Sequence, residues 1–280
     1  MRYLLLPLLL VSSCAFVLNG RVRAELEDSF TFASGGVNLI KVETYNGKVE
    51  LFTSSSSEVD CKAKFYATGL TLEEAEENVN QMKVVSSIDG DVMTISVPRH
   101  SKLGTNNVGA ALNLTLPEDV AIDIYTANGS VETLSAFPSP KVRTSNGSIT
   151  VTASSGPANL RTSNGGIHLV SLSTEDVEAK TSNGPIYYSG DSNDFELRSS
   201  NGTIRIELPA NWKGQGYLDT SNGNIEIKCD GELDCSLSGR TSNGKISVYG
   251  PRLKEFEETD SHLKVETSNG SVKLHHGTEK

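Results

Sequence analysis

Aromatic residues and positive charge are both scarce in this chain. Phe, Trp and Tyr make up 6% of its 280 residues, and 25 Lys and Arg stand against 35 Asp and Glu, for a net charge of −10. A general nucleic-acid binder needs a basic face to neutralise phosphates, so this balance argues against that class. The apolar residues, 36% of the chain, recur in a strict pattern, which argues against disorder.

Cysteine is also scarce, with four residues. Alternation places Cys61 on the apolar side of its segment, as an inert buried thiol. Cys229 and Cys235 flank a short turn-like segment, and an oxidising compartment would permit a disulfide between them. A metal site would need a second Cys or His pair at matching spacing, which the sequence lacks. We therefore predict neither a metal nor a cofactor.

The N-terminus carries a short apolar run. Arg2 precedes the apolar segment Tyr3–Val11, and Val22-Arg23-Ala24 places small residues at positions −3 and −1 of a cleavage site. This order is typical of a secretory signal, so residues 1–24 are expected to be a signal peptide. Pro7 interrupts a run already shorter than the ~20 apolar residues of a membrane span. The protein is therefore predicted to be exported, to the periplasm, cell surface or extracellular space.

Cys14 offers a second interpretation of this segment. Val11-Ser12-Ser13-Cys14 resembles a bacterial lipoprotein box, in which Cys14 would be lipidated. Ala15–Leu18 continues the apolar run beyond Cys14, where such proteins usually turn polar, so we favour cleavage after Ala24. Contact with a membrane is expected only if Cys14 is lipidated.

One motif occurs nine times: Thr or Ser, any residue, Asn, Gly, any residue, then Ile or Val. From the second copy onward the asparagines are 18 to 26 residues apart, which makes this part of the chain a tandem array. The third residue after each Asn is Ile or Val in all nine copies. The asparagines are Asn46, Asn128, Asn146, Asn164, Asn183, Asn201, Asn222, Asn243 and Asn269.

Apolar residues alternate with period two on both sides of each Asn-Gly pair. This predicts two strands per copy, each with one face inward. Asn-Gly is also typical of a two-residue hairpin, but a meander has no reason to keep the same residue at each offset, whereas stacked coils place like on like. We predict an all-β fold, a β-solenoid of coils of about 20 residues over residues 121–274, then a polar tail over 275–280.

The motif's polar residues mark a corner of the coil. Counting by twos places the Thr and the Asn on the inward side, and Gly then takes up the change of parity with a positive φ. If coils stack in register, the Asn amides are expected to form a ladder from coil to coil.

Residues 25–120 follow a different pattern. Val37–Leu51, Glu58–Tyr66 and Val92–Val97 alternate as strands, and Thr71-Leu72-Glu73-Glu74 is a capping box that opens a short helix. We expect this strand and helix region to cap the N-terminal end of the solenoid and block edge-to-edge addition.

The order of these motifs resembles a known family. Leu116–Val120 runs into Ile124–Val131, and Thr-Ser-Asn-Gly coils follow. In this the chain is similar to the DUF4097 putative-adhesin family of bacterial envelope proteins, over about residues 35–274. The resemblance implies an exported β-solenoid, sometimes linked with envelope-stress systems, and supplies no catalytic residues.

Outward positions of the coils are candidates for ligand binding. Three residues before the Asn, four successive copies carry a long cation, which would form a basic stripe: Arg143, Arg161, Lys180 and Arg198. Such a stripe could bind an anionic glycan, an envelope polymer or a protein partner, or its charges could simply pair with neighbouring Glu and Asp. Trp212, alone in a polar insertion, could stack on a sugar ring or cover the solenoid edge.

An enzyme is the alternative from another class, because parallel β-helices also host polysaccharide lyases and hydrolases. It would need carboxylates on one outer face, for which the candidates are Asp191, Asp194, Glu196, Asp219 and Glu226. These lie largely in variable turns, and no Ser-His-Asp or nucleophilic Cys arrangement can be proposed. We predict a non-enzymatic, adhesin-like scaffold for an envelope or extracellular ligand, with a stress-response module acting through a protein partner as the third possibility.

Overall fold

The computed structural model describes residues 16–18, 21–98, 108–172, 176–210, 212–255 and 259–277. Cys14 and most of the predicted signal peptide lie outside these residues. The chain divides into two compact units, Met1–Glu132 and Thr133–Lys280, and passes from one to the other within strand β10 (Val131–Thr133). The division falls later than residue 120, where the sequence suggested it, and the coil of Asn46 belongs to the N-terminal unit.

The described residues of the N-terminal unit form two sheets and one helix. The first sheet has the order β1 (Phe16–Leu18), β2 (Arg21–Ala33), β5 (Glu58–Gly69), β8 (Val108–Pro117) and β4 (Val49–Ser54). The second has the order β9 (Ala121–Thr126), β3 (Leu39–Thr44), β7 (Val92–Ser96) and β6 (Val85–Asp89). β2, β5 and β8 pair antiparallel, whereas β3, β7 and β9 pair parallel.

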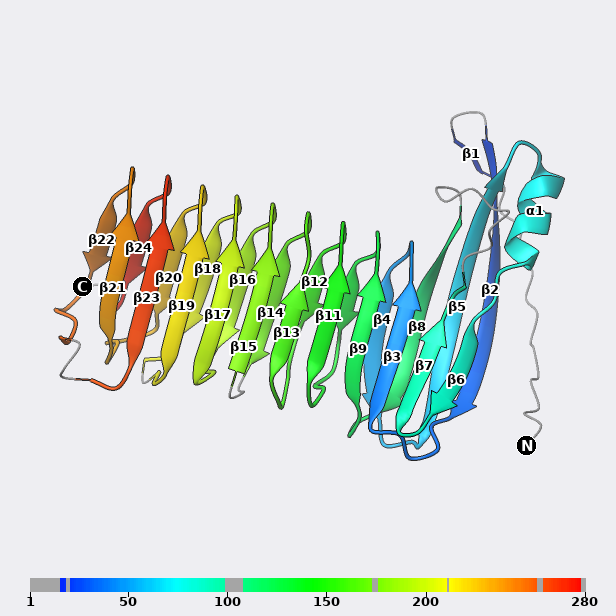
Figure 1. Ribbon diagram of the computed structural model, residues 1–280, viewed down its shortest axis with the longest axis horizontal. Helices are drawn as coiled ribbons and strands as arrows, with labels where there is room; N and C mark the ends of the chain where they lie inside the picture. Colours follow the sequence, from blue (N-terminus) through cyan, green and yellow to red (C-terminus); the bar gives the residue numbers. More distant parts are fainter. Residues whose placement is uncertain are drawn as a thin grey trace. The chain divides into compact units, whose positions relative to one another are not determined.

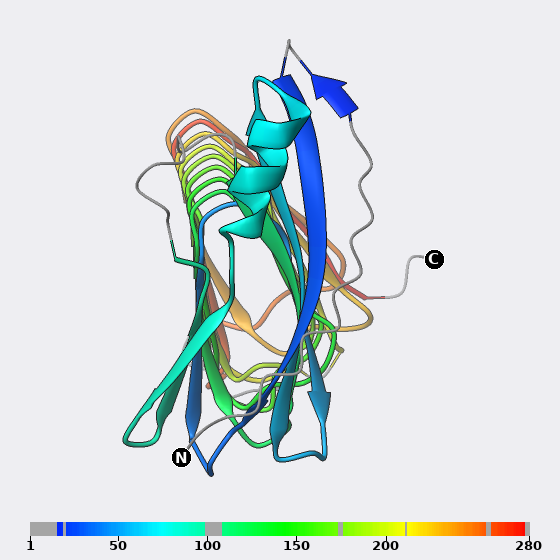
Figure 2. The same ribbon diagram turned by 90° about the vertical axis from the view of Figure 1, so that its right-hand side faces the viewer.

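Helix α1 (Leu72–Asn80) forms where the capping box predicts it. The Thr71 hydroxyl accepts a hydrogen bond from the Glu74 N–H at 3.2 Å, and the Glu74 carboxylate accepts one from the Leu70 N–H at 2.7 Å. Ala75 and Val79 are the buried side chains of the helix. α1 lies beside β2 and β5 of the same unit (Figure 2).

The C-terminal unit is a stack of parallel, in-register coils, as predicted. We call the strands before each Asn-Gly pair sheet 1, in the order β11 (Pro140–Thr144), β13 (Ala158–Arg161), β15 (Asp176–Thr181), β17 (Asp194–Ser199), β19 (Gln215–Thr220), β23 (His262–Thr267) and β21 (Ser236–Thr241). Sheet 2 follows the pairs, in the order β12 (Ile149–Val151), β14 (Ile167–Leu172), β16 (Ile186–Gly190), β18 (Ile204–Leu208), β20 (Ile225–Cys229), β24 (Val272–His275) and β22 (Ile246–Tyr249).

The core of this unit lies between its two sheets, at the positions that the alternation selects. Leu197, Ile204 and Ile206, for example, are fully buried. Each coil repeats this packing, because its inward residues meet the same residue types in the coil beside it.

The last two coils do not stack in chain order. β23 and β24 lie between the coil of β19 and β20 and the coil of β21 and β22, as the ribbon shows (Figure 1). The register confirms this, since β23 pairs with both β19 and β21. The coil over residues 236–249 therefore ends the stack, and Val248, at a core position, is 43% exposed there.

The Asn ladder is present, but its predicted orientation is wrong. In the C-terminal unit the Asn183 amide donates to the Asn164 carbonyl at 2.7 Å, and Asn201 donates to Asn183 at 2.8 Å. These side chains are exposed, whereas the Gly that follows each of them is buried. Alternation along a strand did not extend into the corner, because the backbone turns there.

The predicted reason for the motif glycine is also wrong. Of the nine motif glycines, all of them within the described residues, Gly47 alone has a positive φ, of 124°. Close packing explains seven of the other eight: a Cβ on Gly184 would lie 1.9 Å from the Gly165 carbonyl oxygen, and one on Gly202 would lie 1.8 Å from that of Gly184. A side chain at this position would push the coils apart.

Candidate functional site

The four cations of the basic stripe lie in one column on sheet 1 of the C-terminal unit. Arg143 is directly opposite Arg161, Arg161 is opposite Lys180, and Lys180 is opposite Arg198. Because neighbouring strands are about 4.8 Å apart, the column is a straight row of regularly spaced positions. The repeat thus brings together residues that are 18 or 19 positions apart in sequence.

A second, acidic column runs beside part of this row. Arg161 contacts Glu178 at 3.0 Å, Lys180 contacts both Glu178 and Glu196, and Arg198 contacts Glu196 at 2.7 Å. Hydrogen bonds from Lys180 lower the pKa of Glu178, and its bonds to Glu178 and Glu196 raise the pKa of Lys180. Sequence reasoning allowed for such pairing without naming the partners, although their common offset, five residues before the Asn, could have identified them.

An aromatic side chain continues the acidic column. Tyr217 is opposite Glu196, and both the Arg198 guanidinium and the Lys264 ammonium lie 4.9 Å from the centre of its ring. Its hydroxyl donates to Glu266 at 2.6 Å. Burial, together with this bond, raises the pKa of Tyr217 to about 12, so the phenol stays protonated. On the strands of sheet 1 that follow β17, the outer face therefore carries both a cation, Lys264, and an anion, Glu266.

Trp212 is not available to a ligand. Its side chain is 1% exposed, its indole N–H donates to the Ser192 carbonyl at 2.8 Å, and its ring lies 5.5 Å from that of Phe195. The suggested stacking on a sugar ring is therefore wrong, and the residue covers the core beneath the insertion. The repeat could not show this, because the insertion that carries Trp212 has no counterpart in other coils.

The described cysteines, Cys61, Cys229 and Cys235, are free thiols in the structure, so the predicted bond between the last two is not formed there. Both lie in buried surroundings, and burial raises the pKa of Cys235 to about 12, with the nearby Cys229 adding to the effect. The Cys229 thiol donates to the Pro209 carbonyl at 3.4 Å. Disulfide formation between them stays a prediction.

The carboxylates considered for an enzyme do not form one group. Glu196 pairs with cations of sheet 1, Glu226 pairs with Arg205 on sheet 2, and Asp219 lies on β19, where burial raises the pKa of its carboxyl. Asp191 lies after the end of β16.

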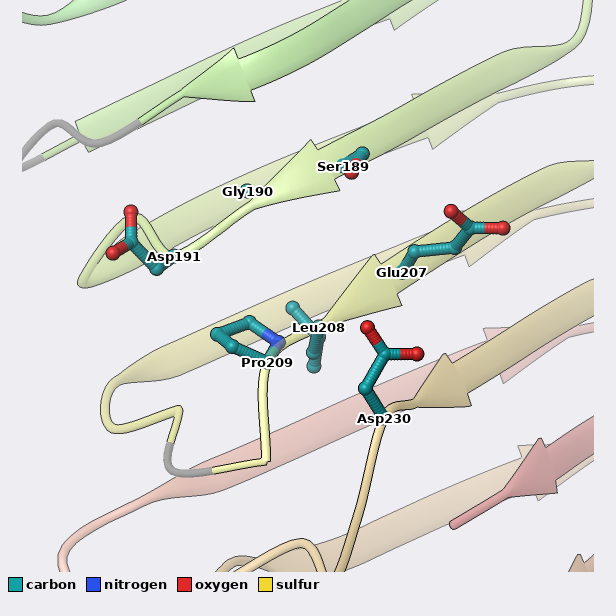
Figure 3. Close-up of a pocket in the computed structure, with 7 residues that line it drawn as sticks. All are labelled: Ser189, Gly190, Asp191, Glu207, Leu208, Pro209 and Asp230. Carbon is teal, nitrogen blue, oxygen red and sulfur yellow. The ribbon is translucent and has the colours of Figure 1, made fainter.

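Asp191 does line a small pocket on sheet 2. Together with Glu207 and Asp230 it surrounds a volume of about 330 Å³ at the ends of three successive strands (Figure 3). The Tyr187 hydroxyl donates to Glu207 at 2.7 Å, which occupies one of these acids. Within the described ranges, no set of three or more His, Cys, Asp and Glu side chains is arranged to hold a metal ion, and no helix is long and apolar enough to span a membrane.

Comparison with known proteins identifies relatives of this fold. The family model described as Toastrack DUF4097 matches residues 29–278. No curated protein is similar enough to count as a match. A "putative adhesin" from Parabacteroides merdae ATCC 43184 aligns with a TM-score of 0.55 at 11% identity, over 89% of this chain and 95% of its own. At that identity the likeness shows the fold alone.

Two further solved structures align less closely. A "putative lipid binding protein" from Parabacteroides distasonis ATCC 8503 has a TM-score of 0.49 at 12% identity, and a "putative adhesin" from Bacteroides fragilis NCTC 9343 has 0.42 at 13%. Each alignment covers 89% of this chain and 96% of the other.

Proposed function

The chain belongs to the Toastrack DUF4097 family, and we propose that it is an exported, non-enzymatic, adhesin-like scaffold that binds an anionic polymer along the basic stripe. The titles of its structural neighbours, in which the word adhesin recurs, support the adhesin-like role. The column of Arg143, Arg161, Lys180 and Arg198 on successive strands carries this proposal. A polymer can repeat one contact from strand to strand, so individually weak contacts add up.

The acidic column sets the expected strength of binding. Glu178 and Glu196 already hold three of the four cations, so a ligand has to replace existing ion pairs. Exposed pairs of this kind are worth about 1 kcal/mol or less, so replacing them is feasible but leaves little surplus per contact. Binding is therefore expected to need several contacts at once and to weaken steeply with salt.

Opposite substitutions in the two columns test the proposal. Dextran sulfate is the probe and neutral dextran its uncharged counterpart, with binding measured by calorimetry at low and at high salt. Changing all four stripe cations to Gln is expected to weaken dextran sulfate binding at least tenfold. Glu178→Gln with Glu196→Gln is expected to strengthen it, because the cations are then released from their partners.

A variant with the same change of charge elsewhere is the control. It carries Arg205→Gln, Lys213→Gln, Lys245→Gln and Lys273→Gln, all at exposed positions of the C-terminal unit. If this variant loses as much affinity as the stripe variant, binding is diffuse and the stripe is not the site. Equal binding of dextran would overturn the requirement for an anion.

Export is tested separately, on the N-terminus of the protein recovered from cells. Mass spectrometry is expected to show a chain that begins at Glu25. A lipidated Cys14, with the protein in the detergent phase, would establish the alternative, and full-length cytoplasmic protein would contradict export. β2 begins at Arg21, so cleavage after Ala24 would remove its first four residues.

A further inference from the structure

A cavity larger than the one beside Asp191 lies at the end of sheet 2, whereas the basic stripe lies on sheet 1. It has a volume of about 570 Å³ and opens among the C-terminal ends of β20, β24 and β22. Lys228 and Tyr249 are each directly opposite His275, so these three side chains form a row at its edge. Cys229 of β20 also lines it, and Asp230, Gly250, His276 and Gly277, from the residues that follow the strands, complete the lining.

His276 has a buried donor without a partner. The side chain is 5% exposed, and its Nδ1 accepts a hydrogen bond from the Leu233 N–H at 3.3 Å. Nδ1 therefore keeps its lone pair, and the proton of the neutral ring is on Nε2. Nε2 is buried and has no hydrogen-bond partner among the described residues. Such a group costs stability unless an acceptor reaches it.

The free edge of the His276 ring faces Gly250. A Cβ on Gly250 would lie 2.9 Å from His276 Cδ2, the ring atom bonded to Nε2. Gly250 and His276 both line the cavity, and Gly250 packs closely on His276, since the same Cβ would lie 2.0 Å from the His276 carbonyl oxygen. Gly250 also has a φ of 134°, a conformation that few other residues adopt.

The remaining lining residues define the chemistry of an occupant. Lys228 adds a positive charge near the His276 donor, and both suit an oxygen anion. Tyr249 is 50% exposed, and its ring stacks on His275 with centres 4.5 Å apart, which holds it as a flat apolar surface. Asp230, exposed at the rim, can accept from hydroxyl groups.

We propose that this cavity binds a carboxylated sugar of the hexuronate class. The carboxylate accepts from His276 Nε2–H and from Lys228, a hydroxyl donates to Asp230, and the apolar face of the ring packs on the exposed side of Tyr249. The site lies on a different sheet from the stripe and is independent of it.

The test is an NMR titration of the full chain with sodium glucuronate, observed at the imidazole signals of His276, assigned with the aid of His276→Gln. In the free protein these signals are expected to report the Nε2–H tautomer, and on titration they are expected to shift saturably. Glucose, which lacks the carboxylate, and acetate, which lacks the ring, are expected to bind at least tenfold more weakly.

Two variants at exposed positions locate the site without disturbing the core. Lys228→Gln is expected to weaken glucuronate binding roughly tenfold. Lys273 is exposed on β24 of the same sheet but lies outside the cavity, so Lys273→Gln is expected to leave glucuronate binding unchanged. The stripe variant is expected to bind glucuronate normally, which separates this proposal from the proposed function. The absence of a saturable shift, equal binding of glucose or acetate, or an equal loss in Lys273→Gln would each overturn the proposal.

Discussion

The hydroxyl group at the first position of the motif joins neighbouring coils. Thr181 Oγ1 accepts a hydrogen bond from the Gly184 N–H of its own coil at 3.2 Å and donates to the Gly165 carbonyl of the preceding coil at 2.9 Å. Thr162 and Thr220 repeat both bonds. The motif therefore requires a hydroxyl here, since this small group satisfies two buried backbone atoms that the turn leaves unpaired.

Replacing one such hydroxyl by a methyl group should be costly. Thr181→Val keeps the size of the side chain but leaves the Gly184 N–H and the Gly165 carbonyl without their partner, so we expect a loss of about 2 kcal/mol in the free energy of unfolding. Thr150→Val, on the outer side of β12, is the matched control and is expected to change it by less than about 0.5 kcal/mol. Urea unfolding followed by circular dichroism measures both, and equal effects would contradict the proposed role.

Within an element, sheet 1 shows what alternation can and cannot predict. It placed Val142, Leu160 and Leu197 inward and the stripe outward, and both predictions are confirmed. The alternation within one strand does not identify a partner on the next strand, so the pairing of Arg161 with Glu178 follows only when the offsets of successive copies are compared. Likewise the corner residues could not be assigned to a side, because the backbone direction changes there.

The charged ladder of sheet 1 should depend on pH. The pKa of Glu178 is lowered in the folded protein, chiefly by its hydrogen bond from Lys180, so its ionised form favours folding. That contribution is present above the ordinary Glu pKa of about 4.3 and is lost as the pH falls through the lowered folded value. Glu178→Gln is therefore expected to lower the melting temperature at pH 7 by an amount equivalent to less than about 1 kcal/mol, and to have little effect near about pH 2.

Thermal unfolding of both proteins across this pH range checks the sign. Glu27→Gln, at an exposed acid in the N-terminal unit, serves as the control for the loss of one negative charge. A difference between wild type and Glu178→Gln that grows as the pH falls would refute the argument.

The N-terminal unit was predicted less completely than the coils. The helix was found because its capping box is a local signal, whereas β2 and β8 were not named as strands. β2 begins inside the segment that was interpreted as a signal peptide, and its outward residues are largely charged. β8 has clear alternation, with Leu112, Leu114 and Leu116 buried, but it lies between two copies of the motif and outside the repeat.

For the molecule as a whole, the order of the last two coils was beyond sequence reasoning. Both carry the same motif, so either can pair with β19 and β20 by the same rules. The cavity lined by His276 depends on this order, because it combines β20, β24 and β22, and it could not be found from the sequence. The predicted polar tail also begins later than residue 275, since β24 ends there and His276 is buried.

Two deletions distinguish the coils at this end. Removal of residues 259–280 takes away a coil paired on both sides, with Leu263, Val265 and Leu274 fully buried, and also removes the support of β21 and β22. Each buried aliphatic side chain contributes about 1.5 to 3 kcal/mol, so this deletion is expected to lower the free energy of unfolding of the C-terminal unit by several kcal/mol. It is also expected to expose residues 236–255 to protease. Removal of 236–258 takes away only the exposed end coil and should cost much less.

Calorimetry and limited proteolysis of the two shortened proteins measure the difference. Equal stability would contradict the inverted order, because it would mean that the coil of residues 236–249 stacks as well on β19 and β20 as the last coil does.

The inverted order also bears on the time course of folding. A chain made from its N-terminus completes residues 236–249 before residues 262–275 exist, so the end coil first meets a vacant edge at β19 and β20 that carries its own motif. Docking there is a kinetic trap, from which the last coil has to displace it. Folding of this unit during synthesis should therefore end in a slow exchange of one coil for another, after most strand structure has already formed.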